Sequence, residues 1–143
     1  MATDSRLTLR TLWPALALVA TLAWVSGFDS SGPDGPNVPY FDKIAHFFVF
    51  GLLGTLWFRW LKGDLNSKGR FALALGLTLS YGVADEWIQS YNSYRVTDVY
   101  DWMADGLGGL VGIFVYRTWT LYRRILETRI SMLLRGQIGG RLR

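Results

Sequence analysis

The chain has 143 residues, a length that suits a single domain. Half of its residues are hydrophobic and only 18% are charged, whereas about 25% are charged in an average soluble domain. This composition favours a membrane protein, and the lack of cysteine excludes a disulfide scaffold and thiolate chemistry.

Four apolar stretches alternate with two kinds of loop. The N-terminus, the loop after the second stretch and the tail are rich in lysine and arginine, whereas the other two loops are mainly acidic. Because basic segments resist translocation, they are expected in the cytoplasm. The pattern predicts an all-α protein of the cell membrane, a four-helix transmembrane bundle with both termini cytoplasmic. The net charge of +4 follows from these flanking residues, so no nucleic-acid partner is expected.

The first two predicted spans cover about residues 12–28 and 44–61. The first is near the lower limit of roughly 17–25 residues for a spanning helix. We expect Pro14 in its first turn, where a missing N–H does no harm. A cleaved signal peptide is the alternative, but further spans follow, and a retained helix is favoured. In the second span, Trp57, Trp60 and Arg59 are expected at the membrane interface.

The third and fourth predicted spans cover about residues 71–91 and 99–116. The fourth is rich in glycine, and its Gly108 and Gly112 form a GxxxG pair that permits close contact with another helix. With these two spans, the predicted membrane domain comprises residues 1–116.

The tail, residues 117–143, changes in pattern. Apolar residues such as Tyr122 and Leu126 share one helical face, and basic residues such as Arg123 and Arg124 share the other. This arrangement predicts a basic amphipathic helix that lies on the anionic cytoplasmic leaflet. The alternative is a mobile basic tail, which the glycines favour for the last residues.

Polar residues form three short clusters, each at the outer end of a predicted span. Residues three or four apart on a helix share a face, so each cluster should present its side chains together. Antiparallel packing of the last three spans would then create one polar pocket. Ionisable groups at membrane depth cost at least ~2.5–3.5 kcal/mol each on insertion scales, so such a pocket needs partners or a purpose. The predicted ligand-binding residues are Asp42, Lys43, His46, Glu86, Gln89, Arg95, Asp98, Asp101 and Asp105.

The ordered segments DKIAHF, DEWIQSY and RVTDVYDWMADGLGG resemble the VanZ-like family of membrane proteins over about residues 40–112. That family shows Asp-Lys-x-x-His, then Glu-x-x-Gln, then Arg-x-x-Asp-x-x-Asp followed by Asn and Gly. The chain differs at Asp105, where the family often has Asn, and at Tyr94, where Gly often precedes the arginine. The resemblance implies a link with low-level resistance to the glycopeptide teicoplanin, and it implies no particular biochemical activity.

These residue types permit several kinds of site. Imidazole and carboxylates together can bind a divalent cation, which is therefore the candidate cofactor. The candidate metal ligands are His46, Asp101 and Asp105. His46 and Glu86 are candidate catalytic residues, because His46 can serve as a general acid or base near neutral pH. Lys43 and Arg95, as the two outer cations, can hold a phosphate or a carboxylate.

Structural roles could explain some of these residues singly. Asp42 and Asp98 could cap their helices, Glu86 could pair with Arg95, and Asp42 or Asp101 could hold His46. Such roles do not explain why the polar residues gather on one side of the membrane. A ligand-binding site is therefore favoured over a purely structural network, and binding is favoured over catalysis.

The predicted function is the binding of an envelope lipid headgroup or a cell-wall-related ligand in an outer-leaflet polar pocket. The expected partners are membrane lipid and either a lipid-linked phosphate or a glycopeptide-related ligand. The alternative is a metal-assisted hydrolase or transferase that acts on a lipid-linked phosphate. Ion transport ranks third, because the inner halves of the predicted spans lack acidic residues.

Overall fold

The computed structural model describes residues 5–27, 40–61, 65–91 and 98–127. They form α1 (Ser5–Gly27), α2 (Phe41–Trp60), α3 (Ser67–Gln89) and α4 (Val99–Thr118), followed by a short helix over residues 120–127. Within these ranges all regular structure is helical, which confirms the predicted all-α class. Each of the four predicted spans lies largely on one of the four long helices.

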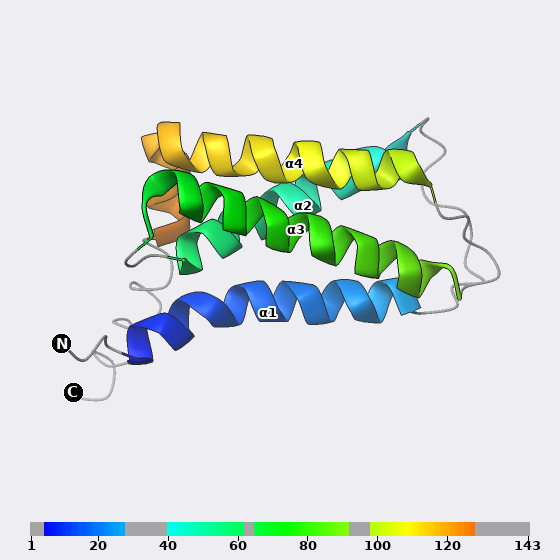
Figure 1. Ribbon diagram of the computed structural model, residues 1–143, viewed down its shortest axis with the longest axis horizontal. Coiled ribbons are helices and arrows are strands. Elements are labelled where there is room, and N and C mark those ends of the chain that lie inside the picture. The colour runs from blue at the N-terminus through cyan, green and yellow to red at the C-terminus, as the bar shows by residue number, and fades with distance from the viewer. Residues whose placement is uncertain (1–4, 28–39, 62–64, 92–97, 128–143) are drawn as a thin grey trace, which may run out of the picture. The chain divides into compact units, whose positions relative to one another are not determined.

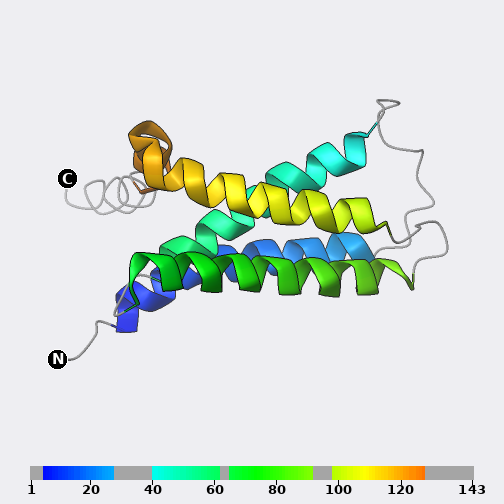
Figure 2. The ribbon, with the colours of Figure 1, turned by 45° about the horizontal axis from the view of Figure 1, so that its top comes forward.

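The chain divides into two compact units, Met1–Ile113 and Phe114–Arg143. In the first unit, consecutive helices run in opposite directions (Figure 1). The ends of α1 and α3 therefore lie at the same end of the unit as the starts of α2 and α4. Figure 2 shows α2 crossing α4 at an angle. This alternation brings together the three chain segments that carry the predicted polar clusters.

Helix α2 provides much of the core of the first unit and packs against both α1 and α3. Its buried apolar side chains include Phe50, Leu53 and Leu56. Ring contacts extend this packing, since Phe50 lies 6.0 Å from Tyr81 of α3 between ring centroids. Tyr81 in turn donates a 2.9 Å hydrogen bond to the carbonyl of Val19 in α1. The three helices are thus joined by both apolar and polar contacts.

Glycines permit close contact between α2 and α4. A Cβ atom on Gly108 would collide with the backbone of Phe47, and one on Gly112 would collide with the backbone of Gly51. A real side chain at either position would therefore force the two helices apart. This confirms the prediction that the GxxxG pair faces another helix.

Two expectations for the helix ends are wrong. Helix α1 begins at Ser5, so Pro14 lies inside it, not in its first turn, and the carbonyl four residues earlier loses its N–H partner. Near the inner end of α2, Trp57 is 9% exposed and Arg59 is 7% exposed. Both side chains are therefore packed within the protein, whereas side chains that anchor a helix at a membrane interface would be exposed.

The surface of the first unit carries many large apolar side chains. Exposed examples are Trp24, Phe48, Val83 and Trp87, distributed over three helices. The buried set, in contrast, includes polar and charged side chains such as Asp85. Among the described residues, one helix, Phe41–Trp60, is long and apolar enough to cross a membrane, and Thr11–Gly27 is a shorter apolar segment.

Candidate functional site

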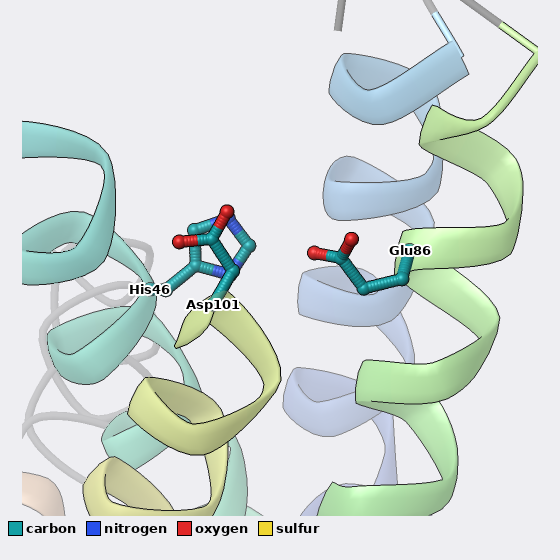
Figure 3. Close-up of side chains that lie close together, drawn as sticks. All are labelled: His46, Glu86 and Asp101. Carbon is teal, nitrogen blue, oxygen red and sulfur yellow. The ribbon is translucent and has the colours of Figure 1, made fainter. Parts of the chain in front are cut away.

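Polar side chains of three helices meet at one end of the first unit. Helix α2 begins at Phe41, earlier than predicted, so His46 lies in its second turn. Glu86 lies near the end of α3, and Asp101 lies in the first turn of α4. Figure 3 shows the Glu86 carboxylate directed toward His46 and Asp101. One ligand atom from each of the three lies within 4.8 Å of the others, so the predicted clusters do converge.

Lys43 joins the start of α2 to the start of α4. Its Nζ lies 2.8 Å from Asp98, 2.9 Å from Asp42 and 3.0 Å from Asp101. An ammonium group has three N–H donors, and here three carboxylates accept them. A phosphate could therefore bind Lys43 only by displacing one of these carboxylates.

Asp98 is also the N-cap of α4, as its sequence position suggested. Its Oδ1 accepts a 2.9 Å hydrogen bond from the Tyr100 N–H, which satisfies a donor in the first turn. The Lys43 ammonium beside it holds the pKa of this carboxyl below its usual range. Asp42 does not cap α2, because Tyr40 occupies that position, with a positive φ of 61° and no side-chain cap bond.

The imidazole of His46 is held from two sides. Its Nδ1 lies 2.8 Å from Asp105 Oδ1, and its ring stacks on Phe50 one turn later, with centroids 5.7 Å apart and planes 7° apart. Asp105 is 0% exposed. A Cβ on Gly82 of α3 would lie 2.7 Å from Asp105 Oδ2, so the glycine provides the space for this carboxylate.

Two buried carboxylate oxygens have no hydrogen-bond partner among the described residues. They are Oε1 of Glu86 and Oδ2 of Asp105. The other Glu86 oxygen, Oε2, accepts a 3.1 Å hydrogen bond from the backbone N–H of Asp98. Buried acceptors are almost always paired in folded proteins, so these two oxygens indicate a partner other than the described residues.

Asp85 and Ser26 adjoin the site, although the sequence pattern did not predict them as part of it. Ser26 of α1 donates a 2.6 Å hydrogen bond to Asp85 Oδ1, and Gln89 Nε2 donates a 2.8 Å bond to Asp85 Oδ2. Gln89 is thus engaged by Asp85, four residues earlier on α3. The i, i+4 spacing of Asp85 and Gln89 was a usable signal, whereas nothing in the sequence linked Ser26 to α3.

Arg95 and Tyr94 lie outside the described residues, so the predicted Glu86–Arg95 pair stays a prediction. Among the described residues of the site, carboxyl groups outnumber cationic groups. They are Asp42, Glu86, Asp98, Asp101 and Asp105, against Lys43 and the imidazole of His46. This balance gives the described part of the site an affinity for cations.

The fold and site together define a helical protein with a buried polar centre under an apolar surface. A family model described as VanZ/LLP1 matches residues 4–122, and the chain belongs to this family. An uncharacterized protein of Schizosaccharomyces pombe is 37% identical over 94 residues, which are 65% of this chain and 56% of that protein. The match thus spans just over half the length of that curated relative. No solved structure matches the chain.

Proposed function

We propose that the chain is an integral membrane protein with four spans, whose polar site lies in the outer leaflet and binds the headgroup of an envelope lipid. The carrying observation is the convergence of His46, Glu86 and Asp101 beneath an apolar surface. Large apolar side chains exposed on all four long helices favour contact with lipid or another apolar partner. At 23 residues, α3 is about 35 Å long, enough to cross a hydrocarbon core of about 30 Å.

The position of the polar site favours a lipid headgroup as its ligand. The site lies near helix ends, where the headgroups of a surrounding bilayer would be, and the apolar sides of the helices would contact the acyl chains. Membership of the VanZ/LLP1 family extends this proposal to glycopeptide resistance. Binding of a lipid-linked cell-wall precursor at this site would reduce the access of a glycopeptide antibiotic.

A metal-assisted hydrolase or transferase acting on a lipid-linked phosphate is the second candidate. The observation that favours it is the short separation between an imidazole and two carboxylates. Such a set can hold a metal ion that polarises a phosphoryl oxygen.

Orientation can be tested at the two ends of α3. Ser67 and Ser90 are exposed and lie at opposite ends of this helix, and the chain has no native cysteine. In intact cells, Ser90→Cys is expected to react with an impermeant thiol reagent, whereas Ser67→Cys should react only after lysis. The reason is that the basic residues beside Ser67 should remain in the cytoplasm. Labelling of Ser67→Cys before lysis would overturn the orientation.

Headgroup binding can be tested by native mass spectrometry of the full chain in detergent. The probes are dioleoyl phosphatidylethanolamine, dioleoyl phosphatidylglycerol and dioleoylglycerol, which share acyl chains but differ in headgroup. We expect the protein to retain at least one phospholipid about tenfold better than dioleoylglycerol, a difference of about 1.4 kcal/mol. His46→Gln should lose this preference, since Gln keeps an N–H for Asp105 but removes the imidazole.

Lys68→Met is the matched control for this experiment, because Lys68 is exposed at the start of α3, away from the site. It should retain the preference for the phospholipid. Equal retention of all three probes by the unmodified protein would contradict headgroup binding.

A further inference from the structure

We propose that His46, Glu86 and Asp101 bind one divalent first-row transition-metal cation, with Asp105 as the residue that positions the imidazole. The inference deepens the proposed function, and rests on it for the lipid phosphate that the cation would meet. The three ligands come from three different helices, α2, α3 and α4. A bound cation would therefore also tie these helices together at one end of the unit.

The contact with Asp105 determines which nitrogen of His46 is available. Asp105 Oδ1 lies 2.8 Å from Nδ1, and a carboxylate there accepts a hydrogen bond from an N–H on that nitrogen. The lone pair then lies on Nε2. Metal-binding histidines almost always donate their other N–H in this way, commonly to a carboxylate, which fixes the tautomer and the ring orientation. Stacking on Phe50 further limits rotation of the ring.

An oxygen is available on each of the two acidic residues. Oε2 of Glu86 is taken by the backbone N–H of Asp98, while the buried Oε1 has no partner among the described residues. Asp101 uses Oδ1 for Lys43, which leaves Oδ2. Among the described residues nothing else contacts these two oxygens, so both can coordinate a cation without breaking a contact with those residues.

The separation of the ligand atoms is close to that of a metal site. Metal bonds near 2.1 Å place neighbouring ligand atoms about 3–3.5 Å apart. The three atoms here lie within 4.8 Å of one another. The side chains must therefore move about an ångström closer together to coordinate one metal ion. The fully buried Asp105, with a second oxygen that no described residue satisfies, adds negative charge behind the imidazole.

The donor set indicates the class of metal. Imidazole suits zinc and neighbouring transition metals, whereas carboxylates also suit Mn²⁺, so the mixed set favours Zn²⁺ or Mn²⁺ over Mg²⁺. Three protein ligands leave at least one coordination position open. A lipid phosphate in that position would be held by the cation, which explains how an anion could bind beside so many carboxylates.

The test uses the full chain in lipid-free detergent, with any affinity tag removed, because the chain has a single histidine. After treatment with a chelator, isothermal titration with ZnCl₂ and MnCl₂ should show one cation per chain. Glu86→Gln is expected to weaken binding by more than tenfold. Asp105→Asn should weaken it by about 10–100-fold, as loss of an outer carboxylate does in other metal sites.

Glu127→Gln is the matched control, since Glu127 is an exposed glutamate of the second unit, where it accepts a hydrogen bond from Tyr116. It should bind metal as the unmodified chain does. A second measurement avoids variants altogether. The ¹⁵N spectrum of the one imidazole should show Zn²⁺ on Nε2, with Nδ1 still protonated.

No stoichiometric binding, unchanged affinity in Glu86→Gln, equal weakening in Glu127→Gln, or Zn²⁺ on Nδ1 would each overturn the metal site. Because these experiments contain no lipid, they are independent of headgroup binding. A chain that prefers phospholipids but binds no metal would refute only this inference. One that binds metal but shows no headgroup preference would refute only the proposed function.

Discussion

Gly108→Ala is expected to lower the free energy of unfolding by about 3 kcal/mol or more, because the new methyl group would meet the backbone of Phe47. Overpacking usually costs about 1–3 kcal/mol when neighbouring side chains can move. A backbone carbonyl within a helix cannot move alone, so α2 and α4 must separate as whole helices. The measurement is the unfolding of the full chain in mixed micelles with increasing denaturing detergent.

Gly76→Ala provides the matched control for this experiment. Gly76 lies within α3, and a Cβ there would have nothing within 4 Å among the described residues. Alanine forms helices better than glycine by about 1 kcal/mol, so Gly76→Ala should be neutral or stabilising. The same substitution is thus expected to have opposite signs at the two positions. Equal stability of Gly108→Ala and the unmodified chain would show that the glycine contact is incidental.

The sequence was sufficient to predict the four helices and their alternation, because each apolar stretch is bounded by charged or proline-rich segments. It also predicted that Gly108 faces another helix. It did not predict that Trp57 and Arg59 are buried. Along α2 apolar residues occur on every side, so periodicity cannot distinguish a face in contact with protein from one in contact with lipid.

The convergence of three polar side chains was also predictable, but the pairing of the polar residues was not. Helical spacing and antiparallel packing brought His46, Glu86 and Asp101 together as expected. The expectation that Asp42 or Asp101 would hold His46 was wrong, because Asp105 does so. Nor could the sequence determine that aspartates would engage Lys43. Each of these pairings depends on side-chain distances of an ångström or two between helices that are remote in sequence.

Lys43 should be the residue of the polar site whose loss most reduces stability. Its side chain is 24% exposed and lies within 3.0 Å of Asp101, whose side chain is only 9% exposed. Lys43→Met would leave that buried carboxylate without its cation, beside the negative charges of Asp98 and Asp42. Removing one partner of a buried ion pair costs about 3–5 kcal/mol. Water screens Lys43, which is 24% exposed, and Asp42, which is 59% exposed, so a smaller loss of about 2 kcal/mol is expected.

A double-mutant cycle in the same micelle assay tests this account of Lys43. Asp101→Asn added to Lys43→Met should recover part of the lost stability, because the buried charge is then removed together with its partner. Lys68→Met, at an exposed position of α3, should change the free energy of unfolding by less than about 0.5 kcal/mol. If the two lysine variants lose equal stability, or if Asp101→Asn worsens Lys43→Met, then the carboxylates at this end of the unit do not depend on Lys43. The buried contact between α2 and α4 would in that case rest on the glycines and on the pair formed by His46 and Asp105.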